Sequence, residues 1–253
     1  MKEIQLINAC FSPTGTTCQV ARAIAVGFGC SVTEMDLSVS DCMVGQLQEN
    51  TVLLAAAPVY GGRIPAVALE RLSQLRGRGQ KAVAVVVYGN REFDDALLEL
   101  KDALTSNGFQ VVAAAAFIAE HSIIRSIAAG RPDEKDLAIA RKFGADVAVK
   151  LETLTVVEVP GKDPYLAVKP STFHPFADEA CVKCGVCGEK CPVGAIPMED
   201  PSQTNNDLCI NCMRCVKVCP VQCRALPAPF IAGATKMLNE KASGYKEPQI
   251  FGI

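Results

Sequence analysis

Nine of the thirteen cysteines in this 253-residue chain lie within residues 181–223, whereas Cys10, Cys18, Cys30 and Cys42 are scattered through the first half. Eight of the nine form two runs with the spacing C-x2-C-x2-C-x3-C-P, offset by 28 residues. Crowded thiols in a reducing compartment favour metal binding over disulfides. The cysteines of the two runs are Cys181, Cys184, Cys187 and Cys191, followed by Cys209, Cys212, Cys215 and Cys219.

The spacing within each run indicates what kind of metal site it forms. Three cysteines at two-residue intervals on one tight loop can bind three irons of a cubic cluster, and the fourth iron needs a thiolate from elsewhere. A cysteine before proline points away from its own loop and can supply that thiolate. Two zinc sites are the alternative, but zinc sites use separated C-x2-C pairs. Cys223 is left over, either as a small buried side chain or as a neighbour of a cluster.

A turn rich in hydroxyl side chains, residues 12–17, follows the first apolar segment and precedes a helix. Such a turn presents backbone N–H groups to an anion, and the helix dipole favours negative charge there. The turn contains no lysine or arginine, so neutral donors would hold a phosphate. The alternative is an ordinary helix cap. The candidate residues are Ser12, Thr14, Gly15, Thr16 and Thr17.

Two more loops follow later apolar segments, and each contains one tyrosine that could stack on a flavin ring. Arg63 could stabilise a reduced flavin beside its N1–C2 edge, or it could be a solvated arginine. His121 could donate a proton to the flavin or be a loop histidine without chemistry. The loops could also be plain strand–helix connections, with Asp94 as a cap. The candidate residues are Pro58, Val59, Tyr60, Gly61, Gly62 and Arg63, then Tyr88, Gly89, Asn90, Arg91 and Asp94.

The first 152 residues alternate two hydrophobic patterns that must position these loops. Strands are predicted at 4–10, 32–37, 51–57, 81–88 and 110–117, and helices at 15–28, 66–75, 94–105 and 132–151. Regular alternation of this kind predicts an α/β fold, a parallel sheet with helices on both faces. The connection 38–50 has no clear pattern.

Together these patterns resemble the flavodoxin–ferredoxin fusion proteins of anaerobic bacteria and archaea. Residues 177–223 resemble a bacterial ferredoxin with two [4Fe–4S] clusters, and loop 12–17 resembles the S/T-x-T-G-x-T phosphate loop of flavodoxins. The resemblance implies FMN, a five-stranded sheet of order 2-1-3-4-5 and a small α+β ferredoxin domain. It also implies one cluster on Cys181, Cys184, Cys187 and Cys219, and the other on Cys209, Cys212, Cys215 and Cys191. The run Gly61-Gly62-Arg63 departs from the more usual aromatic arrangement.

The expected organisation is an FMN-binding domain (1–155), a proline-rich linker (156–176), the ferredoxin domain (177–226) and a partly helical tail (227–253). The apolar content of 49% excludes a disordered chain, and the net charge of −2 argues against nucleic acid as a partner. The longest apolar stretches are shorter than the roughly 20 residues of a membrane span. We see no signal-peptide pattern and expect a cytoplasmic protein.

The expected function is electron transfer between two clusters and FMN, linking low-potential ferredoxin-type donors to a partner reductase or dehydrogenase. Bound clusters and FMN make the protein more acidic, which favours partners with basic surfaces. Two alternatives stay open: an FMN-dependent reductase of a small acceptor, and a ferredoxin whose flavodoxin-like scaffold binds no flavin. The sequence does not predict the oligomeric state.

Overall fold

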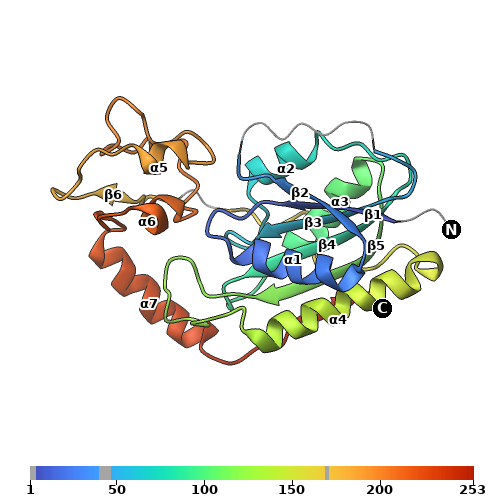
Figure 1. Ribbon diagram of the computed structural model, residues 1–253. Helices are drawn as coiled ribbons and strands as arrows, with labels where there is room; N and C mark the ends of the chain where they lie inside the picture. The colour runs from blue at the N-terminus through green and yellow to red at the C-terminus, as the bar shows by residue number, and fades with distance from the viewer. Residues whose placement is uncertain (1–3, 40–46, 169–170) are drawn as a thin grey trace.

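The computed structural model describes residues 4–39, 47–168 and 171–253 (Figure 1). Its main sheet contains five parallel strands: β1 (Gln5–Cys10), β2 (Ser31–Asp36), β3 (Thr51–Pro58), β4 (Lys81–Tyr88) and β5 (Gln110–Ile118). These strands lie in the order β2-β1-β3-β4-β5. This is the strand order of the flavodoxin-like doubly wound fold, so the predicted fold class is confirmed. Part of the connection 38–50, including Cys42, lies outside the described residues.

The helices cover both faces of the sheet, because β3, β4 and β5 are apolar after their first residue and must be buried on both sides. Helices α1 (Thr16–Phe28) and α4 (Glu134–Lys150) lie on one face, and α2 (Ala66–Leu72) and α3 (Ala96–Ser106) on the other (Figure 1). A Cβ atom at Gly27 would lie 2.0 Å from the Arg141 carbonyl oxygen, and one at Gly144 would lie 2.0 Å from that of Ile24. The two glycines therefore let α1 and α4 pack backbone to backbone.

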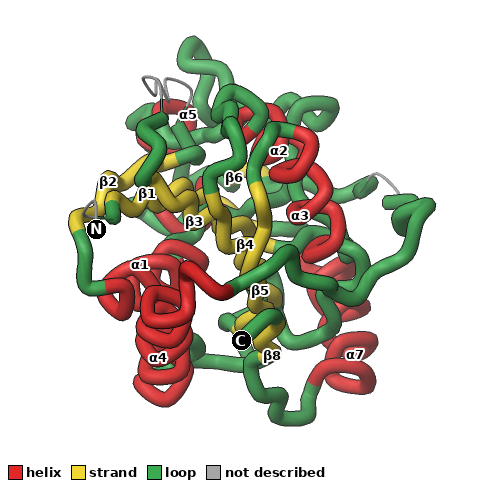
Figure 2. The backbone as a smooth tube through the Cα atoms, turned by 90° about the vertical axis from the view of Figure 1, so that its right-hand side faces the viewer, coloured by secondary structure: helices red, strands yellow, loops and turns green. Residues whose placement is uncertain are grey.

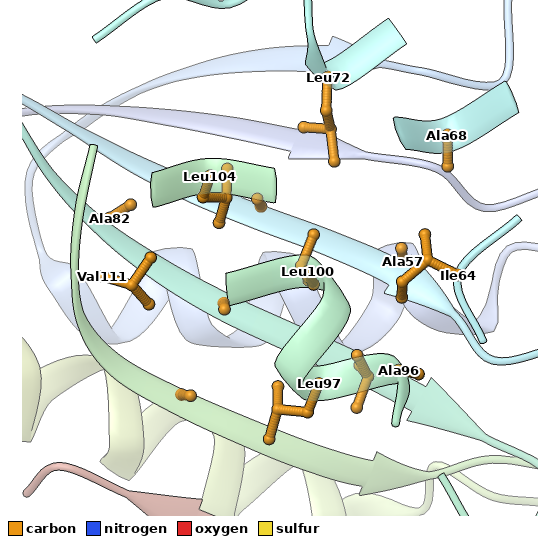
Figure 3. Packing of buried hydrophobic residues seen from close by; sticks show 14 of the residues in the cluster. Ala57, Ile64, Ala68, Leu72, Ala82, Ala96, Leu97, Leu100, Leu104 and Val111 are labelled. Carbon is orange, nitrogen blue, oxygen red and sulfur yellow. The ribbon is translucent and has the colours of Figure 1, made fainter. Parts of the chain in front are cut away.

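Small strand residues leave room for large helix residues in the core under α2 and α3 (Figure 3). Leu97, Leu100 and Leu104 of α3 are fully buried over alanines such as Ala82. This packing fixes the position of α3, and α3 in turn begins directly after the loop that follows β4. The core thus positions the loops at the carboxyl end of the sheet.

A sixth strand, β8 (Gln249–Phe251), pairs antiparallel with the edge strand β5. The prediction of a five-stranded sheet is corrected on this point. Figure 2 shows β8 beside β5, close to the C-terminus. Pairing covers an edge that would otherwise expose unpaired backbone groups. The sequence cue was weak because three residues are too few to show a period.

The tail before β8 is helical, as expected, over α7 (Ala228–Ala242). Leu238 and Ala242 of α7 pack on Ile124 and Ile127 in the loop after β5. In the described part of the chain, no helix is both long enough and apolar enough to cross a membrane.

The segment predicted as a linker lies against the flavodoxin-like sheet and its helices, after the short turn η1 (Leu151–Thr153). We call its residues 157–168 the strap. The Val157 N–H donates to the Val111 carbonyl at 2.9 Å. The Asp95 carboxylate, 7% exposed, accepts the N–H groups of Lys162 at 2.9 Å and Leu166 at 2.6 Å. The strap is therefore bonded to β5 and to the N-terminus of α3.

The cysteine-rich segment folds as two similar halves. It contains β6 (Phe176–Ala177), α5 (Val186–Glu189), α6 (Arg214–Val218) and β7 (Arg224–Ala225), with β6 and β7 paired antiparallel. Three left-handed residues recur at the same 28-residue offset, namely Lys183 and Asn211 (φ 52° and 53°), Gly185 and Met213 (81° and 62°), and Gly194 and Gln222 (62° and 54°). The sequence repeat is thus also a repeat of backbone conformation.

Candidate functional site

Each of two cavities in the cysteine-rich segment is lined by four cysteines of the two runs, and the first is also lined by Cys223. The first cysteine cavity has Cys181, Cys184, Cys187 and Cys219 in its wall. The second has Cys191, Cys209, Cys212 and Cys215. Each set combines three cysteines of one run with the last cysteine of the other, which is the grouping that the resemblance implies.

Two of the thiols have hydrogen-bond donors close by. Among the residues that the structure describes, no three Cys, His, Asp or Glu side chains converge to hold a single ion. The Cys191 sulfur accepts the Ala195 N–H at 3.2 Å. Burial acts to raise the pKa of Cys219, but hydrogen bonds from the backbone N–H groups of residues 221, 223 and 224 lower it. Hydrogen bonds to sulfur of this kind are a feature of iron–sulfur sites.

Two further groups face the first cysteine cavity. Cys223 is buried, and its sulfur lies 3.5 Å from that of Cys219. Arg224 is 2% exposed, and its Nε has no hydrogen-bond partner among the described residues. An orphaned buried donor beside this cavity is consistent with an anionic group there.

Loop 12–17 lies at the N-terminus of α1, with Gly15 in the N-cap position at φ 91°. The Ser12 hydroxyl accepts the Cys18 N–H at 3.1 Å, and the Ser12 N–H donates to the Ser38 hydroxyl at 2.8 Å. Thr17 is buried, and Thr14 and Thr16 line a cavity. Ser12 thus caps the helix from outside, and the two threonines face the space in which a phosphate would lie.

That space, which we call the interdomain cavity, has a volume of about 410 Å³ and lies between the flavodoxin-like sheet and the cysteine-rich segment. Its wall includes Thr14 and Thr16, residues after β5, and residues of α6. The Lys217 ammonium donates to the Thr14 carbonyl at 2.5 Å. Arg125 also lines the cavity and is paired with Glu120 at 2.5 Å. A cation from the other half of the chain therefore faces loop 12–17.

The loops after β3 and β4 meet at the same edge of the sheet, because β3 and β4 are parallel neighbours. Tyr60 and Arg63 close a tight turn through reciprocal backbone bonds of 2.9 and 3.2 Å. Between them Gly61 and Gly62 have φ of 61° and 87°. A Cβ atom at Gly62 would lie 2.4 Å from an Asp94 carboxylate oxygen, so only glycine fits beside the second loop.

The neighbourhood of the first loop is partly covered. Val59 and Ile210 pack against the same core, and a Cβ atom on Gly61 would lie 3.3 Å from a methyl group of Val168 in the strap. Burial raises the pKa of Tyr60 well above its ordinary value, and Cys212 of the second cysteine cavity adds to the shift. Tyr60 and the second cysteine cavity are therefore close neighbours.

The second loop is held by the tail. Tyr88 is 2% exposed, and its ring packs edge-on against Phe93 with centroids 5.5 Å apart. The Asn90 side chain donates to the carbonyls of Ala242 at 2.6 Å and Gly244 at 2.8 Å. Tyr88 would have to leave the core to stack on a flavin ring, so Tyr60 is the better placed of the two tyrosines.

Three other predicted residues have partners of their own. The Arg63 guanidinium donates to Glu99 at 2.8 and 2.5 Å and to the Leu166 carbonyl at 2.8 Å. Arg91 is paired with Asp94. Both arginines thus hold loops in place in this structure, and Arg63 also binds the strap.

His121 closes the turn after β5. Its Nδ1 accepts the N–H groups of Ile123 at 3.2 Å and Ile124 at 3.0 Å. Burial lowers its pKa, and Arg91 adds to the effect. A Cβ atom on Gly89 would lie 2.6 Å from its ring, so the ring packs directly on the loop after β4. An acceptor Nδ1 and a lowered pKa favour the neutral imidazole, not a proton donor.

Sequence reasoning missed Asp95, Glu99 and Lys217. Asp95 and Glu99 stand four residues apart at the start of a predicted helix, a spacing that puts both on one face. That spacing was a usable signal, but acidic residues are ordinary in a first helical turn. Lys217 had no signal, because its place beside Thr14 depends on how two distant segments dock.

Similarities to known proteins are found in both parts of the chain. Residues 203–224 match the family model of the 4Fe-4S binding domain. Among curated proteins, none matches the chain. A flavodoxin from the domain Archaea has 17% identity and a TM-score of 0.43, covering 59% of this chain and 99% of its own. The flavodoxin of Streptococcus pneumonia TIGR4 has 17% identity and a TM-score of 0.43, and the match covers 58% of this chain and 99% of its own. Rubredoxin oxygen:oxidoreductase from the anaerobe Desulfovibrio gigas has 16% identity and a TM-score of 0.43, and the match covers 59% of this chain and 36% of its own.

The flavodoxin-like assignment rests on the strand order of the sheet and not on these distant likenesses. The iron–sulfur assignment rests on the cysteine runs and on the match over residues 203–224. This chain therefore combines a flavodoxin-like fold with a cysteine-rich segment that matches the 4Fe-4S binding domain over residues 203–224.

Proposed function

We propose that this protein transfers single electrons between two [4Fe–4S] clusters and FMN, and so links a low-potential ferredoxin-type donor to a partner redox enzyme. The observation that carries the proposal is the position of Ile210, which lines the second cysteine cavity and packs on the same core as Val59 in the loop of Tyr60. A cluster there would lie next to the edge of the sheet at which flavodoxin-like folds bind FMN.

Several contacts hold the two halves in this arrangement. The Arg71 guanidinium donates to the Leu37 carbonyl at 2.6 Å and to the Pro192 carbonyl at 2.5 Å. Pro192 follows Cys191 and lines the second cysteine cavity. Ile210 packs on the core of the flavodoxin-like domain. The cavity is thus attached to the sheet edge through both of its cysteine runs.

When bound, each cluster exchanges one electron and FMN exchanges one or two. The chain's own residues would bind and shield these groups. The cysteines would supply thiolates, nearby backbone N–H groups would donate to sulfur, and Thr14, Gly15, Thr16 and Thr17 would receive the phosphate. Tyr60 would lie against the flavin ring, and the strap would shield that edge from water. Free thiols in such number suit the reducing cytoplasm that we propose as its compartment.

The test is anaerobic purification followed by measurement of iron, sulfide and flavin per chain. We expect about eight irons and one FMN, the content of two cubes and one flavin site. Electron paramagnetic resonance of the reduced protein should show two interacting clusters. Zinc in place of iron would overturn the proposal at its base.

The coverage of the Tyr60 loop favours one second candidate, a ferredoxin on a flavin-free scaffold. Val168 lies over Gly61, and Tyr88 belongs to the core. Eight irons without flavin, even after reconstitution with FMN, would support this candidate. The reductase alternative would be supported instead by steady turnover of a quinone or nitro acceptor with reduced ferredoxin as donor.

A further inference from the structure

Loop 12–17 has no cation of its own, yet the two halves of the chain place one beside it. Lys217 stands in α6, 203 positions after Thr14, and its ammonium donates to the Thr14 carbonyl at 2.5 Å. The same ammonium lies 3.8 Å from the position of a Cβ atom on Gly15. One of its three N–H groups is used by Thr14, which leaves two for a further acceptor.

We infer that Lys217 completes the phosphate subsite of the FMN site from the ferredoxin-type segment. This inference rests on the proposed function, because it requires that FMN binds. Lys217 and the loop threonines Thr14 and Thr16 line the same interdomain cavity of about 410 Å³. A phosphate in this cavity would receive N–H groups and hydroxyls from the loop and an ammonium from α6.

The charge balance of the cavity supports an anionic occupant. Of its charged side chains, Arg125 and Glu120 neutralise one another in an ion pair at 2.5 Å, and the Gly130 N–H holds the other Glu120 oxygen at 3.1 Å. Arg224 is engaged by carbonyls of the cysteine-rich segment, although its Nε is unpartnered among the described residues. Cys219 also lines the cavity, and with its thiolate counted, Lys217 and Arg224 still leave the lining with a net positive charge. Lys217 is the cation in contact with the loop.

The position of Lys217 also connects flavin binding to the clusters. It lies between Cys215, which lines the second cysteine cavity, and Cys219, which lines the first. Ligands on both sides of Lys217 fix the short helix that presents it. FMN would thus act as an anchor between the two halves, with its phosphate bound by both.

The test compares FMN with riboflavin, which lacks the phosphate, in the cluster-loaded protein. Dissociation constants are measured anaerobically by flavin fluorescence, at low and high salt, for the wild type and for Lys217→Ala. We expect Lys217→Ala to weaken FMN binding about 10-fold or more at low salt and to leave riboflavin binding unchanged, as for a charge-assisted bond to phosphate. Because Lys217 is exposed, high salt should reduce the difference.

Two further variants make the result specific. Lys217→Arg keeps the cation and should retain most of the FMN affinity. Lys236→Ala removes an exposed lysine from α7 and should change the affinity for neither FMN nor riboflavin. This variant controls for the loss of one positive charge. Iron content should match the wild type in every variant.

Three outcomes would overturn the inference. Equal FMN affinity in Lys217→Ala and the wild type would show that the lysine does not bind the phosphate. Equal loss of FMN and riboflavin would show a structural role. The fully cluster-loaded wild type could also bind no flavin at all. That result would contradict both the flavin part of the proposed function and this inference, and the wild-type measurement alone identifies it.

Discussion

Asp95 accepts the Leu166 N–H at 2.6 Å, which joins the first residue before α3 to a strap residue 71 positions later. The second carboxylate oxygen accepts the Lys162 N–H at 2.9 Å. A buried carboxylate with two backbone donors holds the strap in the position from which Val168 covers Gly61.

Asp95→Ala should therefore lower the free energy of unfolding by about 3 kcal/mol, because two charge-assisted bonds are lost and two N–H groups lose their acceptor. Asp95→Asn keeps one acceptor oxygen, and its free energy of unfolding should lie between those of Asp95→Ala and the wild type. Urea unfolding of the flavodoxin-like domain measures the loss. Asp146→Asn breaks only an exposed pair with Lys142 and should stay within about 0.5 kcal/mol. A similar loss in both variants would contradict the role of Asp95.

Because of His121, the free energy of unfolding should decrease as the pH is lowered below about 6.5. This is near the pKa of an imidazole in an unfolded chain. Burial lowers the pKa of His121 in the folded state. As pH falls, the unfolded state therefore binds more protons than the folded state, and stability is lost. The stability that the neutral imidazole contributes is complete only above the pKa of the unfolded state. Protonation also destroys the Nδ1 acceptor used by Ile123 and Ile124. Urea unfolding between pH 5.5 and 7.5 measures this slope. His121→Asn keeps an acceptor without a titrating group, and its slope should be flatter; equal slopes would contradict the assignment.

Loss of Cys219 should be tolerated better than loss of Cys191. The Cys223 sulfur lies 3.5 Å from that of Cys219 and lines the same cavity, so it can replace the missing thiolate. We expect Cys219→Ala to keep most of its iron and Cys191→Ala to lose about half of it, the content of one cube. The double variant Cys219→Ala, Cys223→Ala should fall to the Cys191→Ala level. Equal iron in all three would exclude replacement by Cys223.

Cys18 should react with alkylating agents before Cys10. Their sulfurs lie 3.1 Å apart at the two ends of loop 12–17. The hydrogen bond between the two thiols lowers the pKa of Cys18 against the effect of burial. The same hydrogen bond raises the pKa of Cys10, and burial raises it further. Peptide mass mapping after brief iodoacetamide treatment near neutral pH tests the order. Cys10→Ala should slow labelling of Cys18, and faster labelling of Cys10 would contradict the assignment.

Gly27→Ala should destabilise the protein by about 3 kcal/mol, since its Cβ would lie 2.0 Å from the Arg141 carbonyl oxygen and force α1 from α4. Gly233 is the matched control. It lies inside α7 with nothing within 4 Å of the added carbon, and Gly233→Ala should be neutral or stabilising by up to about 1 kcal/mol. Thermal unfolding measures both. A neutral Gly27→Ala would mean that the two helices pack less closely than described.

The sequence alone determined the local patterns. The apolar runs of β3, β4 and β5 and the alternating helices predicted a parallel α/β sheet, because periodicity is set by neighbouring residues. The order of its strands was implied by the family resemblance and not by the periodicity. The two cysteine runs predicted a cluster-binding segment for the same reason: their spacing is local. The positive φ at Met213 follows the equivalent Gly185, which shows that the repeat extends to the backbone.

Only the tertiary structure decided which groups meet across long separations. β8 closes the edge at β5, Asp95 holds the strap, Arg63 binds Glu99, and Tyr88 enters the core. Lys217 reaches Thr14 across 203 positions and supplies the cation that loop 12–17 lacks. Such contacts depend on how whole elements dock, and docking is set by the summed burial of many side chains. No local pattern at Thr14 or Lys217 could have shown it.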